Sequence, residues 1–328
     1  MKKTVKVSKT NARSILIMLS LFGAVLKTTA QTVSYKVVYD DPMDVPNLFI
    51  SVSPFYCEAS AVGNAANIGF AFQGNYNLGK RLAFEASFAN AYLDLNARNN
   101  NLVTGTEKPL SKHKQIEGGA TFFFRSRLKN KSVQITLAAT QSSKSYINAP
   151  STIHAQTGLR GGVFYYNYAI QAEGKDYFTG TNTETKSDTA LSEYNYHGIS
   201  TNMNVAGSYI GLIRRKTVDI CIQAAGYGQK SHSKIGEIYA DVLFAPVVVY
   251  SDVVLTKSNV KYSLSSTASK FIGWRVGYQI FKPKTVGWQA RLEFGQKPGW
   301  GVKSGYYLLA GWSLTFGIKA KPAKPTTN

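Results

Sequence analysis

The sequence predicts an all-β chain whose strands form a transmembrane, up-and-down antiparallel β-barrel of about 14 strands, with about 12 as the alternative. Three observations predict this fold. The N-terminus is basic and then apolar, apolar and polar residues alternate over many segments, and the charged residues of those segments fall on one face. Alternation with a period of two is the pattern of a β-strand, because its successive side chains point to opposite sides.

The composition excludes several other classes of protein. The 328 residues include 38 Lys and Arg against 18 Asp and Glu, a formal net charge of +20, yet 44% are hydrophobic and 12% aromatic. A disordered polyelectrolyte has far fewer apolar residues. With 2 Cys and 4 His, the chain has too few ligands for a disulfide-stapled scaffold or a clustered zinc module.

The N-terminal segment 1–30 has the pattern of a secretory signal peptide. Five basic residues precede an apolar run, Ile15 to Val25, and small residues precede Gln31, so we expect cleavage near Ala30 and Gln31. The apolar run is too short to cross a bilayer as a helix, and no later run approaches the length of a helical span. Cleavage removes six basic residues, which lowers the net charge from +20 to +14.

Alternation indicates twelve strands along the rest of the chain. They lie near 47–57, 66–76, 81–95, 114–127, 132–145, 152–168, 196–213, 217–230, 236–246, 269–281, 286–296 and 303–318. Short polar connectors predict periplasmic turns at 77–80, 128–131, 214–217 and 282–285, and long polar stretches predict outer loops at 97–113, 171–195 and 251–268.

The positions of these turns conflict with up-and-down order. Two turns on the same side of a membrane must be separated by an even number of strands. Three strands lie between the turns at 128 and 214, and three between those at 214 and 282. Each interval therefore hides a strand, around 163–178 and 247–262, or contains one too many. We favour the hidden strands, hence 14, and expect Pro246 to break a strand.

Seven charged residues in the predicted strands all fall on the face opposite the apolar residues. They are Glu85, Glu117, Arg125, Asp219, Arg275, Arg291 and Glu293, and we expect them to line the lumen. Lipid enforces this segregation, since Arg or Lys at the bilayer midplane of a barrel costs about 2–4 kcal/mol. A soluble β-sandwich or lipid-binding barrel also alternates and is the alternative. The signal peptide and aromatic-rich apolar faces favour the membrane barrel, because only a closed barrel pairs every strand edge in lipid.

The last predicted strand carries a resemblance to a known family. Its segment Gly311-Trp312-Ser313-Leu314-Thr315-Phe316 resembles the terminal-strand signal of bacterial outer-membrane barrels, although twelve residues follow Phe316. The resemblance implies that the outer-membrane insertion machinery recognises Gly311, Leu314 and Phe316 and that the protein lies in the cell outer membrane. A Gln after the cleavage site is similar to exported proteins of Bacteroidota-type bacteria.

These patterns divide the chain into a signal peptide (1–30), a periplasmic lead-in (31–46), the barrel (47–318) and a flexible Lys/Pro tail (319–328). The lead-in contains Asp40, Asp41 and Asp44, which lack the ligand spacing of an EF-hand. We expect this acidic segment to fold toward the basic lumen, where Arg275 and Arg291 project.

The sequence predicts no enzyme, cofactor or metal site, with an outer-membrane hydrolase as the alternative. The four histidines, His113, His154, His197 and His232, are scattered, and no catalytic or metal-binding motif surrounds them. Cys57 and Cys221 both fall on predicted lumen faces, but their strands are far apart in the barrel order, so we expect no disulfide between them.

Two functions fit this sequence: a non-enzymatic barrel that serves as an envelope scaffold or interaction partner, and a pore for small, preferentially anionic solutes. Small lumen residues leave room for a path, among them Gly69, Ala71, Ala83, Ser87, Gly119, Gly273, Gly277, Gly305 and Gly317. Larger ones block it, namely Phe123, Tyr166, Tyr227, Tyr307 and Leu309. The positive charge predicts anionic partners, such as outer-membrane lipid, lipopolysaccharide and other envelope proteins, and export argues against nucleic acid.

Overall fold

The computed structural model describes residues 33–60, 65–94, 104–106, 113–142, 144–172, 179–186, 188–190, 199–255, 260–265, 270–299 and 305–319. The expected signal peptide with its cleavage site, His197 and all but the first residue of the predicted C-terminal tail lie outside these ranges. The regular elements of the described ranges are β-strands. None of these ranges contains a helix long and apolar enough to cross a membrane.

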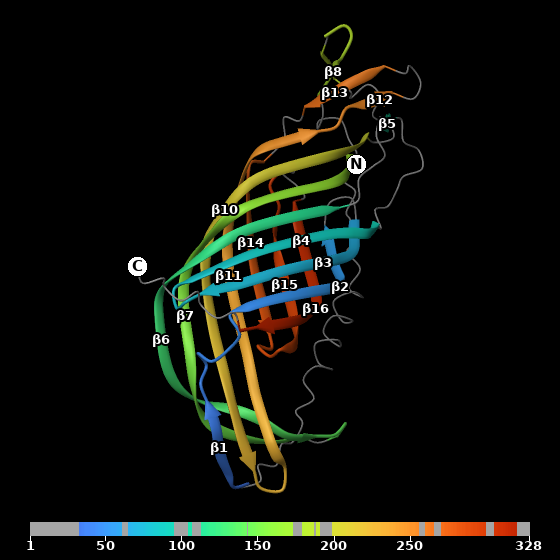
Figure 1. Ribbon diagram of the computed structural model, residues 1–328. Coiled ribbons are helices and arrows are strands. Elements are labelled where there is room, and N and C mark those ends of the chain that lie inside the picture. The colour runs from blue at the N-terminus through green and yellow to red at the C-terminus, as the bar shows by residue number, and fades with distance from the viewer. Residues whose placement is uncertain are drawn as a thin grey trace, which may run out of the picture. The chain divides into compact units, whose positions relative to one another are not determined.

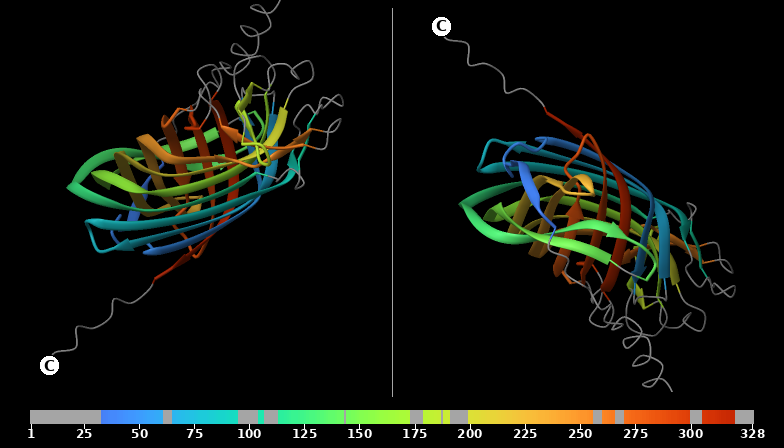
Figure 2. Two further views of the ribbon diagram at one scale, coloured as in Figure 1. Left: turned by 90° about the horizontal axis from the view of Figure 1, so that it is seen from above. Right: turned by 90° about the horizontal axis from the view of Figure 1, so that it is seen from below.

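Ten strands form a closed antiparallel barrel (Figures 1 and 2). Their order around the ring is β10, β11, β14, β15, β16, β2, β3, β4, β6 and β7, and β7 pairs with β10 to close it. Their bounds are Leu48–Ser60 (β2), Ala65–Leu78 (β3), Leu82–Asp94 (β4), Lys114–Ala139 (β6), Lys144–Ala172 (β7), Ile199–Ala224 (β10), Gly228–Tyr250 (β11), Ile272–Phe281 (β14), Val286–Gln296 (β15) and Tyr306–Ile318 (β16).

The predicted count of 14 strands is wrong, and so is the alternative of 12, because two predicted turns are not turns. Residues 128–131 lie inside β6 and residues 214–217 lie inside β10. The chain reverses instead after Ala139 and after Ala224. Removing two turns removes two strands from the twelve and leaves ten, so both intervals contained one strand too many and no hidden barrel strand.

Pro246 does not break a strand, because β11 continues through it to Tyr250. The last residue of β11 that pairs with β14 is Phe244. Proline has no backbone N–H to donate, so it is tolerated where the ladder on that side has already ended.

The other predicted connections lie between barrel strands. Gly79, with a φ of 66°, makes the turn between β3 and β4, and residues 282–285 connect β14 to β15. We call this end of the barrel the turn end. The three long loops follow β4, β7 and β11, and contain five short strands that pair with one another in the order β5, β12, β13, β8, β9. These are Thr104–Thr106 (β5), Thr179–Asn182 (β8), Asp188–Ala190 (β9), Val253–Leu255 (β12) and Lys261–Ser265 (β13).

The chain divides into two compact units, and the smaller one has an ordinary hydrophobic core. Its described residues are 33–40, 131–142, 144–151 and 220–232. Val133, Ile135 and Leu137 of β6 are buried in it, while the intervening Gln134 and Thr136 are exposed. The expected lead-in is therefore partly structured, since its residues Tyr35–Asp40 form strand β1, which pairs with β10 from Ile220 to Ala224.

The barrel unit has the opposite polarity. Each of its ten strands exposes large apolar side chains on the outside of the wall, among them Ile50, Phe72, Phe84, Phe122, Val163, Ile210, Val242, Trp274, Leu292 and Trp312. The residues between them point inward, and many of these are polar and buried. The predicted alternation is therefore confirmed for the barrel wall.

Two long strands change the polarity of their exposed residues along their length. In β10 the side chains of Ile210 and Leu212 are 64% and 56% exposed, the next exposed ones are Arg214 and Lys216, and Ile220 and Ile222 are then fully buried. In β6 the residues 124–132 are exposed on both faces. Leu128 lies on the apolar face of Phe122 and Phe124, whereas Arg125, Arg127, Lys129 and Lys131 lie on the face that points into the lumen at Glu117 and Phe123. Of these two strands, only β10 passes on one and the same exposed face from apolar to cationic, at the segment predicted as a turn.

A bulge in β2 overturns the predicted position of Cys57. The register with β3 shifts between Ser53 and Tyr56, which moves the later residues of β2 to the opposite face. Cys57 is exposed on the outside of the wall instead of facing the lumen, and Cys221 is buried in the smaller unit. Both thiols are free.

Candidate functional site

Charged side chains meet at the centre of the barrel lumen because the strand register brings them together. Asp241 of β11 is directly opposite Arg275 of β14, and both point inward. On the next strand Glu293 is opposite Gly277, two residues along from Arg275, so its side chain reaches the same level. We call the charged groups at this level, with the tyrosines bonded to them, the central cluster.

Arg275 is the centre of this cluster and is 0% exposed. Its Nε donates to Asp241 Oδ2 at 2.7 Å and its Nη1 donates to Glu117 Oε1 at 2.7 Å. Glu117 Oε1 also accepts hydrogen bonds from Gln115 Nε2 at 2.9 Å and from the Tyr166 hydroxyl at 2.7 Å. The guanidinium of Arg275 therefore bridges acidic groups from two other strands of the barrel.

Glu293 accepts hydrogen bonds from three side chains. Arg291 Nη2 donates to its Oε2 at 2.7 Å, the Tyr239 hydroxyl donates to the same oxygen, and the Tyr307 hydroxyl donates to Oε1. Arg275 Nη1 lies 4.0 Å from Oε1. These donors compensate the negative charge of the buried Glu293 carboxylate.

Arg160 completes the central cluster from β7. Its Nη2 donates to Glu85 Oε1 and its Nη1 lies 3.6 Å from Asp241 Oδ2. Its guanidinium carbon lies 4.1 Å from the centroid of the Tyr239 ring and 5.2 Å from that of Tyr209. Cations close to aromatic faces are attracted by the ring quadrupole, more strongly when both are desolvated.

Each arginine of the central cluster is already paired with a carboxylate. Three arginines, at 160, 275 and 291, face four carboxylates, at 85, 117, 241 and 293. Removing one partner of a buried pair leaves an uncompensated charge, which costs about 3–5 kcal/mol. An anion that entered the lumen would find each of these arginines already paired.

Tyrosine rings fill the space that small lumen residues create. A Cβ on Gly277 would lie 2.1 Å from the Tyr239 ring, and a Cβ on Gly119 would lie 2.2 Å from the Tyr209 hydroxyl. The cavities at this level hold about 10 Å³ beside Glu85 and about 50 Å³ beside Gln115. A single water needs roughly 10–15 Å³. The small and the large lumen residues are thus complementary, because tyrosine rings occupy the space beside the glycines.

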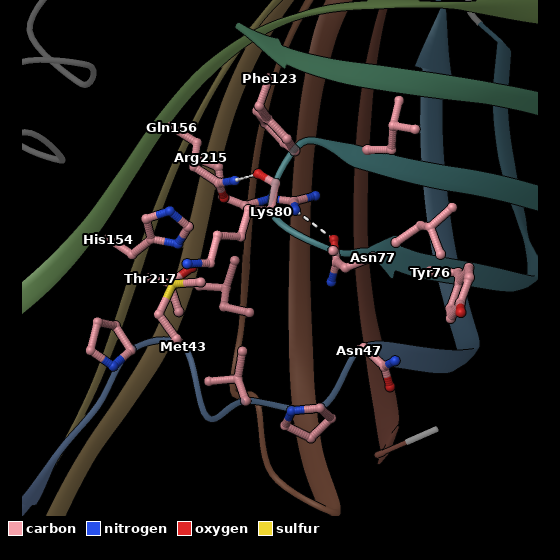
Figure 3. Close-up of a pocket in the computed structure, with 17 residues that line it drawn as sticks. Met43, Asn47, Tyr76, Asn77, Lys80, Phe123, His154, Gln156, Arg215 and Thr217 are labelled. Atoms are coloured by element: carbon pink, nitrogen blue, oxygen red, sulfur yellow. Dashed lines mark hydrogen bonds between the residues drawn. The ribbon is translucent and has the colours of Figure 1, made fainter. Parts of the chain in front are cut away.

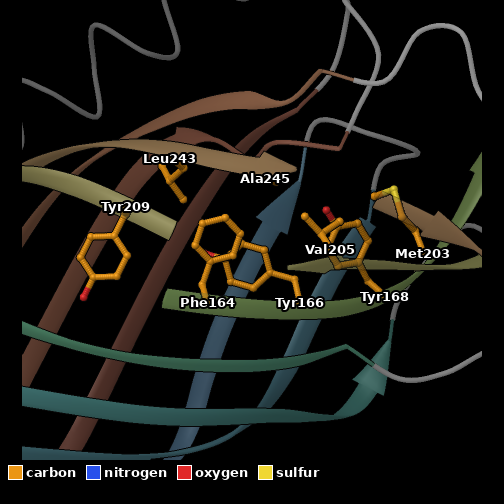
Figure 4. Packing of buried hydrophobic residues seen from close by; sticks show 8 residues of the cluster. All are labelled: Phe164, Tyr166, Tyr168, Met203, Val205, Tyr209, Leu243 and Ala245. Carbon is orange, nitrogen blue, oxygen red and sulfur yellow. The ribbon is translucent and has the colours of Figure 1, made fainter. Parts of the chain in front are cut away.

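Aromatic packing continues along the lumen from Tyr209. Figure 4 shows this buried group, which consists of Phe164, Tyr166, Tyr168, Met203, Val205, Tyr209, Leu243 and Ala245. The rings of Phe164 and Tyr166 stack with centroids 4.7 Å apart. Apolar packing therefore supports the central cluster on one side.

A second ion pair lies beyond these rings. Lys297 Nζ donates to Glu58 Oε1 at 2.6 Å and lies 4.9, 5.0 and 5.6 Å from the ring centroids of Tyr307, Tyr166 and Tyr168. His113, just before β6, lies 3.8 Å from Glu58 through its Nδ1. Burial lowers the pKa of His113 to about 4, so the imidazole is neutral at neutral pH.

Toward the turn end, Arg215 and the amide side chains form a third layer. Arg215 Nε donates to Glu237 Oε1, and its Nη1 donates to Asn77 Oδ1 at 2.6 Å. Gln279 Nε2 donates to Glu237 Oε2, and Gln289 Nε2 donates to Gln73 Oε1 at 2.8 Å. Beyond this layer lies a cavity of about 320 Å³.

Five of the seven predicted lumen charges meet in the central cluster: Glu85, Glu117, Arg275, Arg291 and Glu293. The other two lie elsewhere, because Arg125 is exposed in the basic stretch of β6, and Asp219 is buried near the end of the barrel part of β10. The cluster members that the sequence analysis did not identify are Arg160, Asp241, Tyr209 and Tyr239. Arg160 and Asp241 lie in the predicted strands 152–168 and 236–246. The alternation of apolar and polar residues in these two strands could therefore have assigned both side chains to the lumen.

The acidic lead-in does not reach the arginines of the lumen. Asp44 accepts a hydrogen bond from Lys319 Nζ at 2.7 Å, and Asp40 Oδ1 accepts one from the Ser151 hydroxyl at 2.8 Å. Arg275 and Arg291 are paired with carboxylates of the barrel itself. The expected attraction between the lead-in and these arginines is therefore absent from the described contacts.

The described residues provide little catalytic geometry. Ser126 Oγ lies 2.7 Å from His154 Nε2, but none of the described carboxylates is hydrogen-bonded to His154 to orient it as in a catalytic triad. His232 lies in the smaller unit. Within the described ranges, no three His, Cys, Asp or Glu side chains are arranged to hold a metal ion.

Comparisons with known proteins give only distant structural likenesses. No family model matches the chain, and no curated protein matches its sequence. The toluene transporter TbuX of Ralstonia pickettii is 9% identical with a TM-score of 0.28, over 84% of this chain and 93% of that one. The transport unit of the autotransporter AIDA-I from Escherichia coli is 7% identical with a TM-score of 0.28, over 86% and 93%. The translocator domain of NalP from Neisseria meningitidis is 11% identical with a TM-score of 0.25, over 95% and 99%. These scores are too low to support an argument about function.

Proposed function

We propose that this protein is an integral outer-membrane β-barrel, non-enzymatic and sealed, which acts as an envelope scaffold or interaction partner. The observation that carries the proposal is the change of polarity along the exposed face of β10. The exposed residues of β10 are apolar at Ile210 and Leu212 and cationic at Arg214 and Lys216. One strand with two kinds of exposed face indicates two solvents, hydrocarbon around the barrel and water beyond it.

The lengths and pairing of the strands support the same location. A barrel strand needs about 9–11 residues to cross a membrane, and β14, β15 and β16 have 10, 11 and 13. The closed ring leaves no strand edge unpaired along the wall, which a hydrocarbon surrounding requires. In a water-soluble barrel the Trp and Phe side chains on the outside of this wall would form a large apolar surface in contact with water, which is unfavourable.

The sealed lumen supports a scaffold over a pore. An eight-stranded barrel is just filled by side chains, whereas barrels of about 16–18 strands hold an aqueous channel. Ten strands are close to the filled limit, and here arginine, carboxylate and tyrosine side chains occupy the space. Ions have no wide path through such a layer.

The scaffold role in this proposal belongs to the parts outside the membrane. The smaller unit has a buried apolar core, and its part of β6 exposes the polar residues Gln134 and Thr136, as expected of a structure in water. The proposed partners are outer-membrane lipid and lipopolysaccharide, other envelope proteins, and the insertion machinery, for which Gly311, Leu314 and Phe316 of β16 are the signal. The proposal includes removal of the signal peptide near Ala30 and Gln31 in a Gram-negative, Bacteroidota-type cell.

Planar-bilayer recording tests the sealed lumen. We expect the purified full chain to insert without steady ionic current, and the double variant Y209A/Y239A to pass an ohmic current because it removes two rings that fill the central cluster. The matched control W274A removes an aromatic ring from the outside of the wall and should stay silent. A steady current through the wild-type protein would contradict the proposal.

A pore for small anions is the alternative outcome of the same recordings, favoured by the cavity of about 320 Å³ near one end of the lumen. Such a pore requires the side chains of the central cluster to move apart. If the wild-type protein conducts with an anion bias, Arg275→Glu and Arg291→Glu should move the reversal potential toward cations. An unaltered reversal potential would remove these two arginines from the conduction path.

A further inference from the structure

The cavity at the turn end of the barrel has the dimensions of a small-molecule site. It holds about 320 Å³ and lies between residues 42–47, the turn 76–82 and strands β6, β7, β10 and β11 (Figure 3). Sites for small ligands commonly measure about 300–1,000 Å³ and combine apolar walls with a few polar groups. This cavity lies beyond the central cluster and takes no part in the sealing of the lumen.

The lining is apolar over much of its surface. Met43 and Val45 contribute from the lead-in, Phe123 from β6 and Ile235 from β11. Phe123 is 1% exposed and packs against the guanidinium of Arg215, whose carbon lies 4.7 Å from the ring centroid. These side chains form a surface on which the apolar body of a small ligand would rest.

The charged residues of the lining are cationic. Lys80 and Arg215 both line the cavity, together with His154, and none of the described lining residues is an acid. Arg215 is partly neutralised by Glu237 from behind. The salt bridges of the described residues include none to Lys80, whose side chain extends across the cavity toward Thr217 and Met43 in Figure 3.

The cavity is built in advance of any ligand. Gln156 Nε2 donates to the Lys80 carbonyl at 2.9 Å and fixes the turn that carries the lysine. Residues 41–47 are held at both ends, by the Asp41 amide on the Asp219 carbonyl at 3.1 Å and by the Asn77 amide on the Asn47 carbonyl at 2.7 Å. Binding to a preformed site costs less ordering of the protein.

We propose that this cavity binds a small organic anion with an apolar body, through a carboxylate or phosphate group. The anionic group lies between Lys80 and the outer face of Arg215, and the apolar body lies against Met43, Val45 and Phe123. The same chemistry is offered by a free aromatic or aliphatic acid and by the head of an anionic phospholipid. This inference is independent of the sealed lumen, because it requires no path through the central cluster.

Fluorine NMR of the full chain in phosphatidylcholine nanodiscs tests the site. The probe is 4-(trifluoromethyl)benzoate, and its neutral match is 4-(trifluoromethyl)benzamide. We expect saturable binding of the benzoate at least about 10-fold tighter than of the benzamide, because a charged partner strengthens a hydrogen bond. Absence of saturable benzoate binding, or equal binding of the two probes, would overturn the proposal.

Two neighbouring substitutions separate a site from general charge attraction. Lys80→Ala removes the lining cation, whereas Arg81→Ala removes an exposed cation of the same turn that does not line the cavity. We expect about a 5- to 20-fold weakening of benzoate binding for the first and less than about 2-fold for the second. Both residues are exposed, so neither change threatens folding. Equal effects would assign the binding to the basic surface and refute the site.

The composition of the nanodisc identifies the natural source of the anion. If phosphatidylglycerol in place of part of the phosphatidylcholine weakens benzoate binding to the wild-type protein and to R81A, the site takes a lipid head. If benzoate binding is unchanged, the site takes a free organic acid. Each result is consistent with the proposed chemistry and assigns its source.

Discussion

The barrel and the smaller unit share four strands, but among the described residues only the barrel buries a large cluster of charged side chains. In the barrel, the inward side chains include Arg275, Glu293 and Asp241, and the exposed ones are apolar. In the smaller unit, Val133 and Ile222 are buried, and the exposed residues include polar ones, such as Gln134 and Thr136, and the apolar Val37, Val38 and Tyr39 of β1. The same period of two serves both units, so alternation defines a strand but not its solvent. What separates the units in β6 is the kind of residue on the buried face, which includes Gln115 and Glu117 in the barrel and Val133 and Ile135 in the smaller unit.

The largest expected effect is the loss of the charge at the centre of the lumen. Arg275→Met leaves Asp241 and Glu117 without their main partner, and we expect the free energy of unfolding to fall by about 3–5 kcal/mol. Arg125→Met is the matched control, because Arg125 is exposed, and should change stability by less than about 0.5 kcal/mol. Urea titration of the protein in vesicles measures both. Equal effects would show that the central cluster is not what stabilises the barrel.

The next effect tests whether hydrocarbon surrounds the barrel and water surrounds the smaller unit. Ile210→Arg places a charge on the exposed face of the barrel, which costs about 2–4 kcal/mol near the middle of a bilayer. Thr136→Arg makes the corresponding change on the exposed face of the smaller unit and should cost almost nothing. Refolding into vesicles with denaturant compares the pair. If Ile210→Arg is tolerated as well as Thr136→Arg, the barrel is not surrounded by hydrocarbon.

A smaller effect concerns the fit between glycine and tyrosine in the lumen. Gly277→Ala places a methyl group on the Tyr239 ring and should cost about 1–3 kcal/mol, as overpacking does. Gly74→Ala is the control, since a Cβ there meets no atom within 4 Å. Thermal unfolding monitored by circular dichroism measures both. A harmless Gly277→Ala would mean that Tyr239 moves easily and that the lumen is less tightly filled.

The smallest effect is the pH dependence contributed by His113. Its pKa is about 4 in the folded chain and about 6.5 when exposed, so the unfolded state binds more protons between these values. Stability should therefore fall as the pH is lowered from about 6.5 toward 4, and His113→Gln should flatten this dependence. Denaturant titrations at several pH values test it. An unchanged slope in the variant would assign the dependence to other groups.

The sequence predicted the barrel wall well because the wall follows a simple rule, with apolar side chains outside and charged ones inside. The bounds of β15 were predicted to the residue, and the apolar and charged faces of β14, β15 and β16 were assigned correctly. Five of seven predicted charges reached one cluster for the same reason, since Glu or Arg opposite an apolar face must point inward. Arg125 was assigned by the same rule and lies on the predicted face, but it is exposed because both faces of β6 are exposed over 124–132.

The rest required the structure because it depends on contacts between distant residues. Basic segments such as Arg214-Arg215-Lys216 resemble turns, yet they lie inside strands that continue past the apolar band. The bulge that exposes Cys57 is set by the pairing of β2 with β3. The sequence of one strand also does not show whether a glycine leaves a gap or is covered by a tyrosine ring from another strand. This packing decides whether the lumen is open.

The most direct measurement follows solvent exposure along β10 with spin labels. In a C57A/C221A background, nitroxides are attached at cysteines placed at Ile210, Leu212, Lys216 and Gln223, and their collisions with oxygen and with a water-soluble nickel chelate are compared in vesicles. We predict that oxygen dominates at the first two positions and the nickel chelate at the last two. Dominance of the nickel chelate at positions 210 and 212 would contradict the account, because the wall would then face water.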